Sequence, residues 1–131
     1  MVIDTPTLLI TDDDRSFRET LQCVFEPRGF HTVLAGDGEE ALEIVREERV
    51  HLALLDMHMP RLSGIETIQR FKQVQAILPC ILISGDLDEP LAEQARQANV
   101  FSVHSKPVSS REITSAVVAA LQQTYDWQIA E

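Results

Sequence analysis

Residues 52–66 read LALLDMHMPRLSGIE, an apolar run followed by an acid, a loop and the first turn of a helix-like pattern. The run Leu52–Leu55 has no alternating polar positions, which favours a strand covered on both faces, as in a parallel sheet. It stops at Asp56, and apolar residues then recur at helical spacing from Ile65 to Phe71. The stretch therefore predicts a buried strand, a polar loop at its carboxyl end and an amphipathic helix.

The same alternation occurs five times along the chain. The apolar runs are Thr7–Thr11, Thr32–Ala35, Leu52–Leu55, Cys80–Ile83 and Val100–Val103. The helical stripes run from Phe17 to Phe25, Ala41 to Val45, Ile65 to Phe71, Leu91 to Ala98 and Ile113 to Leu121. Strand alternating with helix predicts an α/β fold whose parallel sheet is covered on both sides. We expect a flavodoxin-like, doubly wound sheet of five strands in the order 2-1-3-4-5, with five helices.

Length and composition indicate a single globular domain. The chain has 131 residues, 44% of them hydrophobic and 24% charged, which suits one compact domain. We expect a single domain over 1–131, with a core of about 7–123 and a short C-terminal tail, 124–131. The start, MVIDTPTLL, has no signal-peptide pattern, and the longest apolar stretch, Ile77–Ile83, is too short to cross a bilayer. These features predict a cytoplasmic protein without membrane insertion.

Charge and cysteine usage limit the possible partners and chemistry. The formal net charge is −10, so the surface would repel phosphate backbones, and direct nucleic-acid binding is not expected. An acidic surface is compatible with a metal ion and with basic partner surfaces. Cys23 and Cys80 stand in apolar surroundings without metal-ligand spacing, which predicts reduced core thiols.

Reactive side chains follow four of the five predicted strands. The first strand ends at Asp12-Asp13-Asp14, the third at Asp56, the fourth at Ser84 and the fifth at Lys106-Pro107. In a parallel sheet all carboxyl ends lie at one edge, where ligands bind. With strand order 2-1-3-4-5, the first and third strands are neighbours, so we expect the acidic residues to meet Asp56.

These residue types together predict phosphoryl transfer to a carboxylate. Clustered carboxylates repel one another unless a cation is present, and Mg²⁺ prefers oxygen ligands. Asp56 can act as the nucleophile, while Lys106 and the Ser84 hydroxyl can hold phosphoryl oxygens. Taken singly, each of these features is more often a solvated loop, a helix cap or a turn. Their joint occurrence, each at a strand end, supports the functional interpretation.

Four motifs resemble the receiver domain of bacterial two-component response regulators, in the CheY-like superfamily. They are LLITDDD (8–14), LLDMHMPRLSGIE (54–66), ILISGD (81–86) and HSKP (104–107). The resemblance extends over about Leu8 to Leu121. It implies a phosphoacceptor domain that takes a phosphoryl group from a phosphohistidine and thereby switches a partner-binding face.

The resemblance assigns a role to each motif residue. Asp13 is implied as a direct Mg²⁺ ligand and Asp12 as a ligand directly or through water. Asp56 is implied as the phosphoacceptor, also touching the metal, and the backbone carbonyl of His58 supplies a further ligand. Ser84 and Lys106 bond the phosphoryl group by the same resemblance, whereas Asp14 receives no metal role.

The family pattern also implies local geometry. Met59-Pro60 and Ser63-Gly64 would shape the loop after the acceptor, and the Lys106–Pro107 peptide bond would be cis. Asn99 stands where a glycine is common, and asparagine tolerates the left-handed backbone that such a position needs.

One position departs from the family pattern. The aromatic residue usual three positions before the lysine is replaced by Val103, and Phe101 lies two residues earlier, which predicts the same strand face. We therefore expect signalling to rely on displacement of the loop after Ser84. His58 and Asp86, two residues beyond the acceptor and the hydroxyl, would tune the lifetime of the phosphate.

Two other functions are compatible with the sequence. Asp12-x-Asp14 after an apolar strand also resembles haloacid-dehalogenase-type phosphatases, in which Asp12 would be the nucleophile. Alternatively, the chain is a pseudo-receiver, an interaction module that works without phosphorylation. The expected partners are a sensor histidine kinase or phosphotransfer protein and a downstream output domain or protein. A homodimer through the fourth helix, fifth strand and fifth helix is a further possibility.

Overall fold

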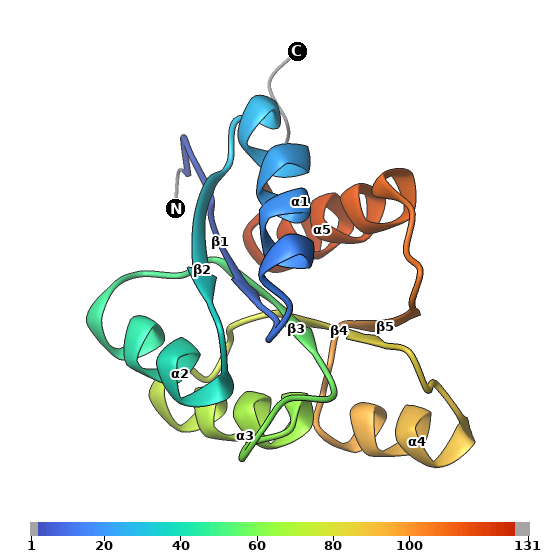
Figure 1. Ribbon diagram of the computed structural model, residues 1–131. Helices are drawn as coiled ribbons and strands as arrows, with labels where there is room; N and C mark the ends of the chain where they lie inside the picture. The colour runs from blue at the N-terminus through green and yellow to red at the C-terminus, as the bar shows by residue number, and fades with distance from the viewer. Residues whose placement is uncertain (1–2, 128–131) are drawn as a thin grey trace.

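The computed structural model describes residues 3–127, and its five strands form one parallel sheet. The strands are β1 (Thr7–Thr11), β2 (His31–Ala35), β3 (Leu52–Asp56), β4 (Cys80–Ser84) and β5 (Ser102–Ser105). Their order is β2-β1-β3-β4-β5, and every neighbouring pair is parallel (Figure 1). The predicted fold class and strand order are confirmed.

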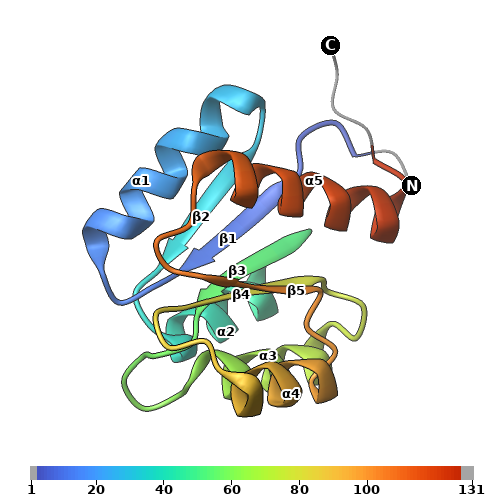
Figure 2. The same cartoon turned by 90° about the vertical axis from the view of Figure 1, so that its right-hand side faces the viewer.

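Helices cover both faces of this sheet. They are α1 (Arg15–Phe25), the 3₁₀ turn η1 (Glu26–Arg28), α2 (Gly38–Glu47), α3 (Gly64–Val74), α4 (Glu89–Gln97) and α5 (Ser110–Tyr125). Helices α1 and α5 lie on one face, and α2, α3 and α4 lie on the other (Figures 1 and 2). The arrangement is the doubly wound, three-layered one that alternating strands and helices favour.

The core consists of two apolar clusters separated by the sheet. Successive strand residues point to opposite faces, so Leu54 packs on the α1/α5 side and Leu55 on the α2/α3/α4 side. All five residues of β3 and all five of β4 are buried. This burial explains why these two strands read as continuous apolar runs in the sequence.

Polar side chains at the carboxyl ends of the loops start the helices. The N-cap residues, whose side chains accept backbone N–H groups of the first turn, are Asp14, Asp37, Ser63, Asp88 and Ser109. At α3, Ser63 and Glu66 form a reciprocal capping box, which satisfies two backbone donors at once. Each cap fixes the helix start directly after the sheet edge that carries the predicted site.

The fifth strand differs from its prediction. It spans Ser102–Ser105 rather than Val100–Val103, and Phe101, just before it, packs against the α1/α5 cluster. Val103 packs against the opposite cluster, so the expectation that Phe101 and Val103 share a face is wrong. As an edge strand with one neighbour, β5 is only half-buried, which accounts for its polar sequence, SVHS.

Further sequence predictions concern the two cysteines, the Lys106–Pro107 bond and Asn99. Cys80 is a buried core thiol, but Cys23 is exposed on α1, so the prediction is wrong for Cys23. The Lys106–Pro107 bond is cis, and Asn99 has a φ of 58°, both as expected. No helix of the described residues is long and apolar enough to cross a bilayer.

The C-terminal segment continues to pack after the predicted core ends. Helix α5 runs to Tyr125, whose hydroxyl donates to the backbone carbonyl of His51 at 2.8 Å. The Trp127 ring lies 5.6 Å from that of Phe30. The predicted tail is thus packed as far as Trp127, and residues 128–131 lie outside the described part of the chain.

Candidate functional site

Three aspartates meet where β1 and β3 end. Asp12 follows β1 and Asp56 closes β3, and these strands pair in the centre of the sheet. Each of Asp12, Asp13 and Asp56 places a carboxylate oxygen within 4.8 Å of the other two. Asp12 is 1% exposed and Asp56 6% exposed, whereas Asp13 is exposed. The convergence expected from the strand order is therefore present, with an opening on the Asp13 side.

Several backbone and side-chain bonds fix Asp12. Its Oδ1 accepts the N–H of Asp14 at 2.8 Å, and its own N–H donates to the carbonyl of Ala35 at 3.2 Å. The Nη1 atom of Arg18 donates to the Asp12 backbone carbonyl at 2.7 Å. The first helix thus supports the acidic cluster through Arg18 as well as through its Asp14 cap.

Lys106 reaches the cluster from the β5–α5 loop. Its Nζ lies 3.0 Å from Asp12 Oδ2 and 3.2 Å from Asp56 Oδ1. Its backbone N–H donates to the Ser84 carbonyl at 2.9 Å, which ties the loop to the end of β4. The structure therefore brings the predicted lysine to both buried acids.

The electrostatics of the site follow from burial and like charge. Burial raises the pKa of Asp56, and the neighbouring Asp12 charge raises it further, outweighing the opposite effect of Lys106. For Lys106, burial alone would lower the pKa, but its bonds with Asp12 and Asp56 prevail and raise it. The cluster holds three carboxylates and one ammonium, so its net charge is negative when all four groups are ionised.

This donor set fits a hard divalent cation. Three carboxylates that share a pocket are the ligands that Mg²⁺ prefers, and a cation there would relieve their repulsion. Asp13 is exposed, so the cluster is open to solvent on this side. The residues present thus fit Mg²⁺, while the ligand role of the His58 carbonyl stays a prediction.

The loop after Asp56 is held tightly under the site. The Gly64 N–H donates to the Met57 carbonyl at 2.8 Å. A Cβ at Gly64 would lie 2.6 Å from the Asp56 carbonyl oxygen and 2.7 Å from Leu82 Cδ1, so a side chain there is excluded. Arg61 adopts a left-handed backbone and pairs with Asp37 at 2.6 Å, joining this loop to the cap of α2.

The remaining predicted residues lie at or just after the ends of β3 and β4. Ser84 is fully buried at the end of β4, and its Oγ accepts the N–H of Asp86 at 3.1 Å. His58 Nε2 lies 3.6 Å from Asp86 Oδ2, so the two residues that follow the acceptor and the hydroxyl approach each other. Both side chains are largely exposed, at 58% and 85%, which places them in contact with solvent.

Sequence reasoning missed two residues of this site. Arg18 supports Asp12, and the Phe17 ring lies 4.4 Å from the Lys106 ammonium. In the sequence, Phe17 is one member of an apolar helical stripe, and nothing marks it as a neighbour of a lysine far along the chain. Arg18 could have been predicted, because a cationic residue one helical turn after an acidic triplet is close enough to contact it.

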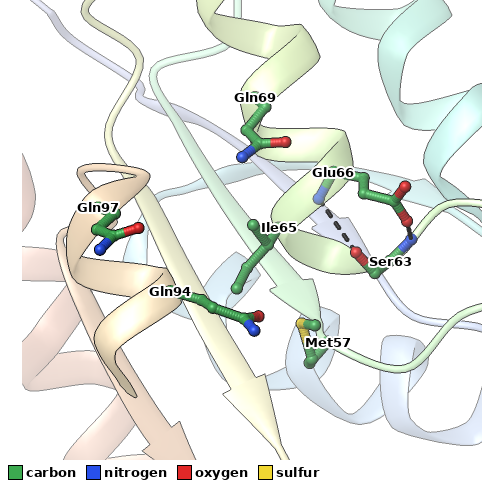
Figure 3. Close-up of a pocket in the computed structure, with 7 residues that line it drawn as sticks. All are labelled: Met57, Ser63, Ile65, Glu66, Gln69, Gln94 and Gln97. Atoms are coloured by element: carbon green, nitrogen blue, oxygen red, sulfur yellow. Dashed lines mark hydrogen bonds between the residues drawn. The ribbon is translucent and has the colours of Figure 1, made fainter. Parts of the chain in front are cut away.

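A cavity of about 520 Å³ lies between α3 and α4. Its lining comprises Met57, Ser63, Ile65, Glu66, Gln69, Gln94 and Gln97. The Gln94 side chain extends from α4 toward Ile65 and Met57 (Figure 3). None of Asp12, Asp13 and Asp56 lines this cavity, although Met57 directly follows Asp56 in the chain.

Comparison with known proteins places this geometry in a family. The family model described as "Response regulator receiver domain" matches residues 8–118. The chain belongs to this family. Receiver domains are the phosphoacceptor part of two-component signalling, and that role accounts for a carboxylate cluster with a lysine at the sheet edge.

Individual relatives agree with this receiver assignment. The chain is 35% identical over 112 residues to sporulation initiation phosphotransferase F of Bacillus subtilis, covering 84% of this chain and 89% of that protein. It is 30% identical over 117 residues to the alkaline phosphatase synthesis transcriptional regulatory protein PhoP of the same organism. That match covers 89% of this chain but only 49% of PhoP, so the chain spans about half the length of such regulators.

A solved structure shows the same fold. The CheY-like response regulator receiver domain protein of Methanospirillum hungatei JF-1 superimposes with a TM-score of 0.89 at 21% identity. The match covers 93% of this chain and 98% of that one. Nearly the whole chain is thus accounted for by the receiver fold.

Proposed function

We propose that this chain is a single receiver domain that catalyses the transfer of a phosphoryl group to its own Asp56. The observation that carries the proposal is the meeting of Asp12, Asp13 and Asp56 within 4.8 Å, with Lys106 bonded to two of them. The donor would be a phosphohistidine of a sensor kinase or phosphotransfer protein. The cytoplasmic location expected from the sequence belongs to the same proposal.

The transfer exchanges one bond to phosphorus for another. An Asp56 carboxylate oxygen forms a bond to phosphorus as the bond between phosphorus and the donor imidazole nitrogen breaks. The electron pair of the broken bond stays on that nitrogen, and the product is an acyl phosphate on Asp56. Asp56 is suited to this role because it ends a buried strand and its Oδ1 is held at 3.2 Å by Lys106.

The surrounding residues supply orientation and charge. Asp12, Asp13, Asp56 and the His58 carbonyl are the proposed Mg²⁺ ligands, and the bound ion would neutralise charge on the phosphoryl oxygens. Lys106 carries an ammonium that can move from Asp12 to a phosphoryl oxygen. Ser84 lies at the end of the neighbouring strand, where its hydroxyl can donate to another.

Phosphorylation then acts as an electrostatic switch. The acyl phosphate adds roughly two negative charges at the sheet edge, which favours conformations that bring Lys106 and Ser84 toward it. Lys106 is bonded through its backbone to Ser84, so movement of one loop is transmitted to the other. We propose that α4, β5 and α5 form the responding face, and that the loop after Ser84 moves in place of an aromatic at Val103.

Chemical mapping of the phosphorylated residue tests the proposal. Incubation with phosphoramidate and Mg²⁺ should give a labile acyl phosphate in the peptide that contains Asp56, and D56N should remain unlabelled. Label on Asp12 would instead support the phosphatase-like chemistry. No label on the wild-type chain, with correct folding and Mg²⁺ binding, would leave a phosphorylation-independent interaction module as the function.

A further inference from the structure

The Lys106 ammonium has a third neighbour besides the two acids. The Phe17 ring, on the first turn of α1, lies with its centroid 4.4 Å from Lys106 Nζ. We propose that Phe17 is a positioning residue for phosphoryl transfer, holding the Lys106 ammonium beside the acceptor. The inference rests on the proposed function of Asp56 and extends it to a residue that acts on the site through Lys106.

Three elements converge on one ammonium group. Asp12 contacts it from the end of β1 at 3.0 Å, Asp56 from the end of β3 at 3.2 Å, and Phe17 from α1 at 4.4 Å. The Lys106 side chain is 28% exposed and has a long flexible stem, so without a third contact it is free to turn toward solvent. The Phe17 ring supplies that third contact.

An aromatic ring holds an ammonium group better than an aliphatic side chain of similar size does. The negative face of an aromatic ring attracts a cation within about 6 Å of its centroid, and the attraction strengthens with partial desolvation. A leucine would fill the same space but would exert no such attraction.

The position of the ring is built into the start of α1. Asp14 caps this helix, and its Oδ1 accepts the N–H of Phe17 at 3.3 Å. Phe17 is half-buried and packs against the α1/α5 cluster, which leaves part of its ring available to Lys106. The third acid of the motif, which has no expected metal role, thereby sets the place of the ring.

The contact should matter most when the phosphoryl group arrives. Lys106 must then exchange its bond with Asp12 for one with a phosphoryl oxygen, and a ring that keeps the ammonium at the site favours this exchange over release to water. We expect F17L to take up phosphoryl groups about two- to five-fold more slowly than the wild type. F17Y, which keeps the ring, should restore the wild-type rate.

The test compares these variants with F101L. Phe101 is also half-buried and packs against the same cluster, so F101L removes a ring and leaves the Lys106 contact intact. The first measurement is the rate of acyl phosphate formation from phosphoramidate with Mg²⁺. The second is the proton NMR shift of the Lys106 ε-methylene group in Mg²⁺-free protein, which a ring face moves upfield.

The NMR measurement is independent of phosphorylation and separates the two claims. The inference predicts that F17L alone loses the upfield shift and alone becomes slower. It is overturned if the Lys106 shift is the same in F17L as in wild type, or if F17L and F101L slow uptake equally. A normal upfield shift in a wild-type chain that takes no phosphoryl group would contradict the proposed function of Asp56, and the positioning role with it.

Discussion

The Gly64→Ala substitution tests how closely α3 approaches the acceptor strand. Its new Cβ would lie 2.6 Å from the Asp56 carbonyl oxygen, 2.7 Å from Leu82 Cδ1 and 3.0 Å from Met57 Cα. Two of these atoms belong to the backbone of the segment that carries the acceptor, and the third is a methyl group of the fully buried Leu82. The first turn of α3 must therefore move away from β3, breaking or lengthening the bond from Gly64 N–H to the Met57 carbonyl.

Two opposing effects determine the change in the free energy of unfolding: overpacking lowers it, and the higher helix propensity of alanine raises it. Forcing extra atoms into a packed region costs about 1–3 kcal/mol, whereas alanine in place of glycine in a helix contributes up to about 1 kcal/mol of stability. Gly64 is the first residue of α3, so the propensity gain is at its smallest there. We expect a net loss of about 2 kcal/mol, which lowers the melting temperature by about 5–10 °C in a chain of this size.

Thermal unfolding followed by circular dichroism measures this loss, and Gly85→Ala is the matched control. A Cβ at Gly85 meets no heavy atom within 4 Å, so that variant should melt close to the wild type. G64A should also take up phosphoryl groups more slowly, because the Asp56 backbone is displaced. A G64A variant as stable as the wild type, or more stable, would refute the close approach of helix and strand.

Three further predictions concern the charges of the site. In Mg²⁺-free buffer at neutral pH, D56N should melt above the wild type, because burial and the Asp12 charge raise the pKa of Asp56 and make its ionised form destabilising. The difference in melting temperature between D56N and the wild type should shrink as the pH falls through the raised pKa, because Asp56 of the wild type then binds a proton and loses its destabilising charge. A difference that grows toward acidic pH would contradict this prediction. Mg²⁺ at a hundred times its dissociation constant should stabilise the wild type by about 2.7 kcal/mol in the same assay. The same Mg²⁺ concentration should stabilise D56N by less, and equal stabilisation of the two proteins would exclude Asp56 as a ligand. Replacing His58 and Asp86 together with alanine should change the rate at which the acyl phosphate decays, because the two side chains, each two residues beyond Asp56 or Ser84, approach each other to 3.6 Å. An unchanged decay curve would reject a role for them.

The limits of a strand can be predicted from the sequence where one physical constraint acts on all of its residues. Buried parallel strands must be apolar on both faces, so β3 and β4 could be located to within a residue from Leu52–Leu55 and Cys80–Ile83 alone. The edge strand β5 lacks that constraint because it has one neighbour and partial exposure, and its limits were misplaced by two residues. Cys23 was misjudged for a related reason, since an apolar neighbourhood in sequence does not fix which side of a helix is buried.

The sequence by itself indicated the sheet order, because strands alternating with helices favour the doubly wound arrangement. It also located the acids at the sheet edge, because parallel strands all end on the same side and four of the five ends carry a reactive side chain. Only the tertiary structure decided how the side chains meet there. Lys106 and Asp12 are 94 positions apart, and their contact, like that of Phe17 with the same ammonium, depends on the packing of α1 and of the β5–α5 loop against the sheet. Local patterns record which residues are buried, but contacts between distant segments follow from how whole elements pack, which no single stretch encodes.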